Sequence, residues 1–456
     1  MTRLNVNNLL KILQAHPGMS SAELCRRLGG IDRSTLTRRL ATLGRAVISR
    51  GGSRRTAYAL RRALRGSDAS IPVYRIDEAG RGHQAGVLDC TQPTGTALLF
   101  HEPFLWPLRD AMQDGWFDGL PYPVVDARPQ GFLGRNFARH HAMMLRVSEN
   151  PDDWSDDDIL HVVSSVGFDL PGNLILGDVA YRQFLERGVA RASSVLSEQE
   201  ISESYPAQAS SAMAHGDVGS SAAGEFPKFT ALREMGGLPV DVIVKFSGAD
   251  DSAAVRRWAD LLVCEHLALR VLESELGIAA AQSQIYQFSG RTFLEVVRFD
   301  RHGVSGRSPV CTLQSLNAAV LGMASSSWAK VSTQMHKEKL ISAGTAHTIE
   351  LLWWFGKLIG NSDMHDGNLA FRANMELTPA YDMLPMFFAP APGGEVPVRE
   401  FKPLPPLPAE REPWQRAASA AIVYWQKCAQ DERVSDGFRY ICDECANAVR
   451  RLAEQI

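Results

Sequence analysis

The chain has 456 residues, a hydrophobic content of 45% and a formal net charge of −3. This length is sufficient for two or three domains with cores of their own. The apolar run at residues 351–355 is far shorter than a membrane-spanning helix, and the basic pattern that starts near the N-terminus leaves no room for a secretory signal. Seven scattered cysteines are typical of free thiols in a reducing compartment. The composition therefore argues against a membrane protein, and we expect a cytoplasmic location.

Residues 1–66 are strongly basic. They contain 14 Lys and Arg residues against two acidic residues, a net charge of +12, so the rest of the chain carries −15. An imbalance of this kind favours a nucleic-acid partner for one end of the molecule only. The alternative is a small helical protein-interaction module whose charges only solvate it.

The same segment has the pattern of a winged helix-turn-helix domain. Residues 8–15 predict a short helix, residues 20–23 begin a second with a capping box, and residues 32–40 begin a third. The third has the polar, basic face that a recognition helix in a major groove requires, and residues 47–60 predict a hairpin with a basic tip. We expect DNA contacts from the third helix and from the hairpin tip, through Arg33, Ser34, Thr35, Arg38, Arg54 and Arg55.

The next two segments differ in composition. Residues 67–196 mix short strand patterns with turns, so we expect a small β-rich domain there. Residues 197–215 are rich in Ser, Ala and Glu with almost no large apolar side chains, which is typical of a mobile linker.

A loop of small residues, a strand with a lysine and a helix with a glutamate follow. The loop at residues 215–229 has a backbone that can approach a phosphate, and Lys228 would add charge, although simple flexibility is the alternative. The β-branched strand at residues 240–246 carries one cation, Lys245, which needs an anionic partner unless it lies at a sheet edge. The helical pattern between residues 258 and 277 contains Glu265, either that partner or a solvated residue.

The segment 361–368 reads Asn-Ser-Asp-Met-His-Asp-Gly-Asn and has the layout of a phosphoryl-transfer centre. Asp363 is placed to accept a hydroxyl proton, Asn368 to hold Mg²⁺, and Asp382 to supply a second metal ligand. The spacing of the first two equals that of the protein-kinase catalytic loop. Residues 369–379 predict strand, turn and strand, which would bring Asn368 and Asp382 together. Taken alone, the segment is also compatible with an Asx-rich turn.

Two features of the C-terminal part have plain interpretations. The Pro-rich stretch at residues 390–408 predicts a surface loop, with a proline-rich ligand for another domain as the alternative. Cys442 and Cys445 lie in an amphipathic helical pattern with no second Cys or His pair nearby in sequence, so we expect no zinc there.

The order of these motifs resembles the HipA family of bacterial serine/threonine kinases, the toxins of type II toxin–antitoxin modules. The resemblance covers about residues 72–456 and is carried mainly by residues 220–382. In typical members a separate antitoxin binds the DNA. This chain instead carries a basic N-terminal domain of its own, and in this it resembles the YjjJ-like members. The resemblance implies an α+β fold, a protein-kinase-like two-lobed HipA fold preceded by the winged helix-turn-helix domain of residues 1–66. Residues 67–196 would be the β-rich HipA N-terminal subdomain, 216–300 the kinase N-lobe with the phosphate loop, and 301–456 the helical C-lobe with the catalytic loop.

The resemblance also implies roles for individual residues. Ser221 takes the place of the family's autophosphorylated serine, Lys245 contacts the α/β-phosphates of ATP, and Asp363 is the catalytic base. Asn368 and Asp382 hold the metal as well as the nucleotide. The remaining nucleotide contacts would come from the phosphate loop (Ala223, Gly224, Glu225, Phe226, Pro227, Lys228), from the adenine-facing linker (Val297, Arg298, Phe299) and from residues beside the phosphates (His365, Asp366, Gly367, Tyr381).

We therefore expect an ATP- and Mg²⁺-dependent serine/threonine protein kinase with its own DNA-binding domain. Its partners would be DNA, a protein substrate with a Ser or Thr and, by the resemblance, an antitoxin protein. A phosphate on Ser221 would repel the phosphates of ATP and switch the enzyme off. The alternatives are a DNA-binding transcriptional regulator whose kinase-like body only senses a nucleotide, a lipid or small-molecule kinase, and a metal-dependent nuclease.

Overall fold

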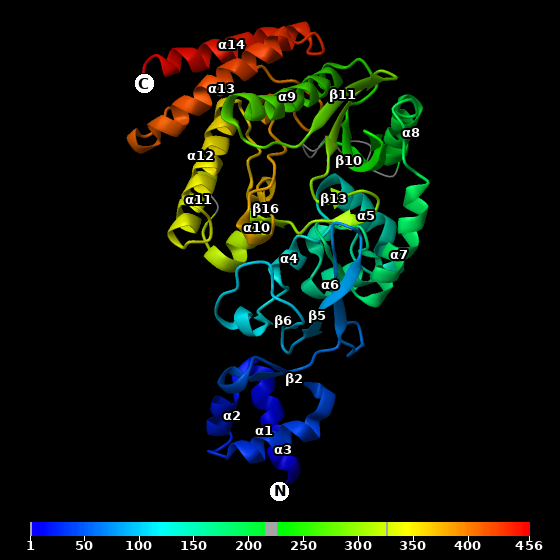
Figure 1. Ribbon diagram of the computed structural model, residues 1–456, viewed down its shortest axis with the longest axis vertical. Coiled ribbons are helices and arrows are strands. Elements are labelled where there is room, and N and C mark those ends of the chain that lie inside the picture. The colour runs from blue at the N-terminus through cyan, green and yellow to red at the C-terminus, as the bar shows by residue number, and fades with distance from the viewer. Residues whose placement is uncertain (1, 215–225, 325–326) are drawn as a thin grey trace. The chain divides into compact units, whose positions relative to one another are not determined.

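The computed structural model describes residues 2–214, 226–324 and 327–456 (Figure 1). The chain forms two compact units, one made of the residues up to 77 with 81–128 and 141–187, the other of 78–80, 129–140 and the residues from 188 onward. Helices and sheets are both present in each unit, in agreement with the expected α+β class. Among the described residues, no helix is both long enough and apolar enough to cross a membrane.

The N-terminal segment of the first unit forms three helices and a small sheet. The helices are α1 (Thr2–Ala15), α2 (Ser21–Arg27) and α3 (Arg33–Leu43), and the strands β1 (Met19–Ser20), β2 (Val47–Arg50) and β3 (Ala57–Leu60) follow the order β1-β3-β2. Ser20 and Asp32 cap α2 and α3, because their side chains accept the amides of Glu23 and Thr35. Leucines from all three helices form the core. The winged helix-turn-helix arrangement expected from the sequence is therefore present.

The rest of the first unit is built on a five-stranded antiparallel sheet with the order β7-β6-β5-β4-β8. Its strands are β4 (Ile71–Ile76), β5 (Gly82–Cys90), β6 (Thr96–Phe100), β7 (Trp116–Phe117) and β8 (Leu174–Leu176). The helices between residues 122 and 192 are α4 (Tyr122–Val125), α5 (Gly131–Leu145), α6 (Asp156–Val166) and α7 (Asp178–Ala192), and residues 131–140 of α5 and 188–192 of α7 count to the second unit. The sequence predicted the strands and missed the helices. The capping box of Ser155 and Asp158 at the start of α6 was a readable signal for one of them.

The second unit contains a four-stranded antiparallel sheet. Its strands are β9 (Lys228–Met235), β10 (Leu238–Phe246), β11 (Ser283–Phe288) and β12 (Arg291–Val297), in the order β11-β12-β10-β9, and the long helix α9 (Ala253–Leu276) packs on it. Because side chains alternate along a strand, Val242, Val244 and Phe246 of β10 face one side of the sheet and Lys245 faces the other. The sheet thus separates an apolar core from the face that carries the lysine.

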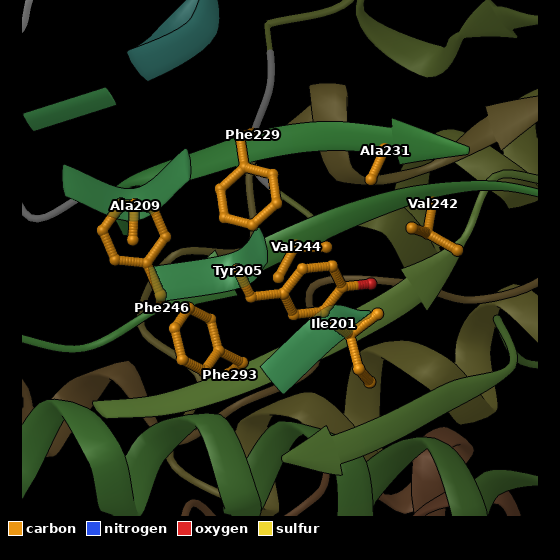
Figure 2. Packing of buried hydrophobic residues seen from close by; sticks show 9 residues of the cluster. All are labelled: Ile201, Tyr205, Ala209, Phe229, Ala231, Val242, Val244, Phe246 and Phe293. Carbon is orange, nitrogen blue, oxygen red and sulfur yellow. The ribbon is translucent and has the colours of Figure 1, made fainter. Parts of the chain in front are cut away.

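Helix α8 (Ile201–Ala214) covers the apolar face, where the sequence had predicted a mobile linker. Ile201, Tyr205 and Ala209 recur at a spacing of four, so they lie on one side of the helix and pack against Phe229 and Phe293 (Figure 2). The linker prediction was wrong because the apolar stripe is narrow and the surrounding Ser and Ala residues hide it.

A buried polar network also fastens this helix. Arg233 of β9 donates to Glu295 of β12 at 2.8 Å and to Glu198 at 2.5 Å, and the hydroxyl of Tyr205 donates to Glu295. Arg233 and Glu295 are both 1% exposed, so each charge depends on the other for its stability in the core. The sheet and α8 therefore form one rigid layer behind Lys245.

The C-terminal part of the second unit is helical. Its helices are α10 (Leu313–Leu316), the π-helical turn η6 (Asn317–Leu321), α11 (Trp328–Lys337), α12 (Ala343–Leu358), α13 (Arg411–Gln430) and α14 (Asp436–Ala453), with the short strand pairs β13 (Arg301–His302) with β14 (Gly306–Arg307) and β15 (Cys311–Thr312) with β16 (Ala370–Phe371). Helix α13 packs against α9, α12 and α14 (Figure 1). This bundle supports both α9 and the loop that follows α12.

Three cysteines meet in this bundle. The sulfur atoms of Cys264, Cys428 and Cys442, from α9, α13 and α14, lie within 4.8 Å of one another and are fully buried. Cys442 has no second Cys or His pair nearby in sequence, yet the fold brings it together with two cysteines that are distant in sequence. Burial raises the pKa of the Cys428 and Cys442 thiols well above the usual value. At Cys264 burial also raises the pKa, but hydrogen bonds from these two thiols and from Tyr424 outweigh it and lower the pKa. Free cysteines buried in this way pack as small, weakly polar groups.

Candidate active site

Lys245 lies at the centre of the candidate site. Its ammonium donates to the two carboxylate oxygens of Glu265 at 2.7 and 2.8 Å and also contacts the carboxylate of Asp382. Lys245 is 6% exposed and Glu265 is 1% exposed, so neither charge is compensated by water. The prediction that Glu265 is the partner of Lys245 is confirmed, and Asp382 is brought to the same cation from 137 residues away.

The register of the sheet adds a second lysine. Lys228 of β9 is directly opposite Lys245 of β10, so the two side chains share one face of the sheet. Lys245, Glu265 and Asp382 together carry one net negative charge when all are ionised, and Lys228 offsets it. The face therefore holds two cations and two carboxylates, which suits a ligand that combines phosphates with a divalent metal.

The titration of these groups follows from burial and charge. Burial lowers the pKa of the Lys245 ammonium, but Asp382 and Glu265 outweigh burial and raise that pKa above its usual value. For Asp382, burial raises the pKa, while Lys245 and Lys228 outweigh burial and hold the pKa below its usual range. Burial dominates for Glu265 and raises its pKa. Asp382 is thus the carboxylate that stays ionised and available to a metal.

The loop after α12 places Asp363 beside this cluster. The side-chain oxygen of Asn361 accepts the amide of Asp363 at 3.0 Å, and its side-chain nitrogen donates to the carbonyl of Asp382 at 3.2 Å. Asn368 donates to the carbonyl of Asp363 at 2.9 Å. Through its two hydrogen bonds the buried Asn361 fixes the loop of Asp363 and the Asp382 segment to each other. The sequence named Asp363, Asn368 and Asp382. The Asn361 amide joins Asp363 to Asp382, and the side chain of Asn368 joins Asn368 to Asp363.

The chain between Asn368 and Asp382 turns back as predicted. Phe371 forms a bridge with Leu377, and the hydroxyl of Tyr381 donates to the carbonyl of Gly367 at 2.8 Å. Asp382 itself has φ 54°, in the left-handed region that Asp tolerates better than most residues. Strained backbone of this kind is frequent at ligand-binding positions.

Some residues expected at the nucleotide also make contacts within the fold. Phe226 is buried and packs edge-on against the ring of Trp258 at 4.7 Å. The carboxylate of Asp366 is buried and accepts the side-chain amide of Asn317 at 3.3 Å, so it points into the lobe. Pro227 contributes its carbonyl to the amide of Phe246. These contacts indicate structural roles for the three expected ligands.

Part of the backbone of the expected adenine-facing linker is bonded within the fold. The amide of Val297 donates to the carbonyl of Gln282 at 2.8 Å, and the amide of Arg298 donates to the carbonyl of Asp241 at 2.9 Å. These two amides are therefore occupied by the sheet and cannot also bind a base edge. Phe299 remains, with its ring 5.6 Å from the ring of Tyr381. Its position beside the Asp382 segment suits a contact with an aromatic base.

Comparison with known proteins bears directly on this arrangement. The chain is 34% identical over 444 residues to Toxin YjjJ of Escherichia coli (strain K12), and the match covers 96% of both chains. Residues 220–452 match the family model of the HipA-like C-terminal domain, and residues 67–185 match that of the YjjJ-like toxin middle domain. The chain belongs to the HipA-like toxin family, as a YjjJ-like member.

Two solved structures are similar at a lower level. One is the Shewanella oneidensis MR-1 HipA of a toxin–antitoxin system in complex with HipB and operator DNA, at 16% identity and a TM-score of 0.46 over 84% of this chain and 95% of that one. The other is the Helicobacter pylori proinflammatory kinase CtkA, at 11% identity and a TM-score of 0.33 over 50% of this chain and 92% of that one.

The residues that the sequence analysis missed are those that hold the loop. Asn361 is the first residue of the segment 361–368, and no role was assigned to it from the sequence. An Asn two residues before an Asp is nevertheless a common signal of a turn in which the Asn side chain bonds to the backbone. Gly356 of α12 is a second residue to which the sequence assigned no role. A Cβ atom there would lie 2.4 Å from the sulfur of Met364, so a larger residue would displace the end of this flexible side chain.

The proposed DNA-facing residues fall into two groups. Ser34 and Thr35 donate their hydroxyls to the capping carboxylate of Asp32, at 2.6 and 2.9 Å, and Arg55 lies 3.4 Å from Asp114. In the described part of the chain, no ion pair holds the three other predicted cations, Arg33, Arg38 and Arg54, which are exposed. Exposed cations that form no ion pair within the described residues therefore lie on α3 and on the turn of the wing, and also at Lys11 and Arg45.

Several other cations of the basic segment are bound within the first unit. Arg50 and Arg61 contact Asp89, Arg62 contacts Asp157, and Arg65 contacts Asp158. These pairs neutralise part of the net charge counted from the sequence. The count of 14 basic residues thus overstates how many can reach a phosphate.

Proposed function

We propose that the chain is an ATP- and Mg²⁺-dependent serine/threonine protein kinase with a DNA-binding domain of its own. The observation that carries this proposal is the set of contacts around Lys245 and Asn361. One joins the strand lysine to Glu265 and Asp382, and the other joins Asp382 to the loop of Asp363 and Asn368. Phosphoryl transfer depends on positioned charges more than on covalent chemistry, and these are the charges that it requires.

The roles of the residues follow from their surroundings. Lys245 and Lys228 would bind the phosphates of ATP, while the ionised Asp382 and the side-chain oxygen of Asn368 would hold Mg²⁺. The metal would neutralise charge on the phosphates when it is bound. Asp363 is exposed and would accept the proton of a Ser or Thr hydroxyl as its oxygen attacks the γ-phosphorus and the bond to ADP breaks.

Replacing Asp363 with Asn should lower phosphate transfer by about 10²–10⁴-fold, because the amide cannot take the hydroxyl proton. The measurement is transfer from labelled ATP with Mg²⁺, followed by mass-spectrometric mapping of the label. In the native chain we expect label on Ser221, which lies outside the described residues together with Ala223, Gly224 and Glu225. Label that persists in the Asp363→Asn chain would contradict the proposed role of Asp363.

The same experiment separates the kinase from the main alternative. A DNA-binding regulator that only senses a nucleotide would bind ATP without any transfer, and the Asp363→Asn change would leave its control of an operator intact.

A Ser221→Ala chain should keep transferring phosphate to other proteins after incubation with ATP, if phosphorylation of Ser221 is the proposed off-switch.

The DNA-binding part of the proposal rests on the exposed cations of α3 and of the wing. If the domain contacts about five phosphates, the slope of log affinity against log salt should be near −4.5. Arg33→Ala and Arg38→Ala should each make this slope shallower by about 1. Arg62→Ala is the control, because Arg62 is already paired with Asp157. A slope equally altered by all three changes would point to general charge rather than to contacts of α3.

A further inference from the structure

An open groove of about 320 Å³ lies on the helical side of the catalytic loop. Its floor and walls come from the start of α11, the end of α12 and the loop between Ser362 and Asp366, so the proposed catalytic base, Asp363, is part of its lining. The groove holds no group assigned above to the nucleotide except those of the catalytic loop. Since the acceptor hydroxyl must reach Asp363 from outside the nucleotide site, the groove lies where an acceptor polypeptide has to approach.

Lys357 is the cation of this groove. It sits one residue before the end of α12, and its ammonium lies 4.4 Å from the centre of the Trp353 ring, which also lines the groove. Both side chains are half-buried. Among the described residues, no carboxylate forms an ion pair with Lys357. Asp366, the other acid of the lining besides Asp363, has its carboxylate turned to Asn317.

A half-buried ammonium without an anionic partner favours a ligand that supplies one. The cation–π contact with Trp353 holds the ammonium in place and removes part of its water. A carboxylate that enters the groove therefore binds this ammonium more strongly than it would on an open surface. The same stacking restricts Lys357 to one position, which reduces the entropy lost on binding. Loss of hydration also lowers the pKa of Lys357, in line with the absence of a carboxylate that would raise it.

We propose that this groove binds the acceptor polypeptide and that Lys357 selects an acidic residue close to the accepting Ser or Thr. The proposal rests on the kinase function proposed above and adds the class of substrate. Trp353 provides the aromatic wall, and Lys357 provides the charge. Lys357 is a specificity residue in this scheme, since it contacts neither the nucleotide nor the transferred phosphate.

The test uses the full chain, Mg-ATP and three sets of Ser-containing peptides that differ only in flanking Glu, Gln or Lys residues. The native chain should phosphorylate the Glu peptides with a kcat/KM about tenfold above the Gln peptides, mostly through KM. Lys357→Glu should reverse the order, so that the Lys peptides become the best substrates. Lys330→Glu, at an exposed position of α11 outside the groove lining, is the matched control and should leave the order unchanged.

The outcomes separate this proposal from the one on which it depends. Transfer without any preference for Glu peptides, or a preference that survives in Lys357→Glu, overturns the inference about the groove while the kinase function stands. Absence of transfer by the native chain to peptides and to itself overturns both. Reversal of charge preference is a result that mere damage to the fold at Lys357 would not produce.

Discussion

Lys245→Met should abolish phosphate transfer and lower the free energy of unfolding of the second unit by about 3–5 kcal/mol. The change removes the ammonium that contacts both Glu265 and Asp382, and it leaves a carboxylate that is 1% exposed without this cation. Removing one partner of a buried ion pair costs far more than the pair contributes, because the remaining charge stays desolvated. The measurements are denaturant unfolding and transfer from labelled ATP.

The pH dependence of this variant follows from the same physics. Burial already raises the pKa of Glu265 above the unfolded value, and loss of Lys245 would raise it further. A carboxyl whose pKa is raised in the folded state stabilises the fold below its unfolded pKa and loses that contribution as the pH rises. The destabilisation of Lys245→Met should therefore be smaller near pH 4 than near pH 8.

A second substitution separates stability from chemistry. In Lys245→Met with Glu265→Leu the buried carboxylate is gone as well, so most of the lost stability should return while phosphate transfer stays absent. Lys228→Met is the matched control, because Lys228 shares the face of the sheet but is less buried. If the double variant remained as unstable as the single one, the uncompensated charge of Glu265 would not be the cause of the lost stability.

The local motifs of this protein were readable because each has its own chemistry. Ser20 and Asp32 are N-cap residues and therefore indicate where two helices begin. The spacing of Asp363 and Asn368 is that of a kinase catalytic loop, and a cation inside a β-branched strand requires an anionic partner. In each case the physical constraint acts over a few residues. Such constraints can be recognised without knowledge of the tertiary structure.

What escaped prediction depends on contacts between distant segments. Helix α8 was taken for a linker because its short apolar stripe has meaning only against the sheet that it covers. Phe226 and Asp366 resembled ligands by position, whereas their side chains pack on Trp258 and bond to Asn317. A sequence pattern places a residue near a site, but the direction of its side chain is decided by the surrounding fold.

The charge of the basic segment illustrates the same limit. A net charge of +12 over residues 1–66 indicated DNA binding, yet Arg50, Arg61, Arg62 and Arg65 are held by acids of the following region. A count of charges cannot distinguish cations that bind DNA from cations that join two parts of a chain. The distinction requires the partner of each side chain.

Asn361→Ala should reduce kcat by about 10²-fold while the affinity for Mg-ATP changes by about twofold or less. Asn361 touches no expected substrate atom, but its amide group accepts the amide of Asp363 and donates to the carbonyl of Asp382. Without this amide, nothing holds Asp363 and Asp382 at a fixed distance from each other through Asn361. A displacement of about 1 Å is enough to lower kcat by this amount. We therefore regard Asn361 as a positioning residue, and kcat and KM measured separately would test this.

The decisive comparison is with a second buried asparagine of the same lobe. Asn317 bonds to the backbone of Met323 and to Asp366, so Asn317→Ala removes a similar number of hydrogen bonds without touching Asp363 or Asp382. Both variants should lose about 1–3 kcal/mol of stability, since each leaves buried polar groups unpaired. Only Asn361→Ala should show the large fall in kcat. Equal losses of kcat would mean that Asn361 supports the fold of the lobe in general and does not specifically align the two catalytic aspartates.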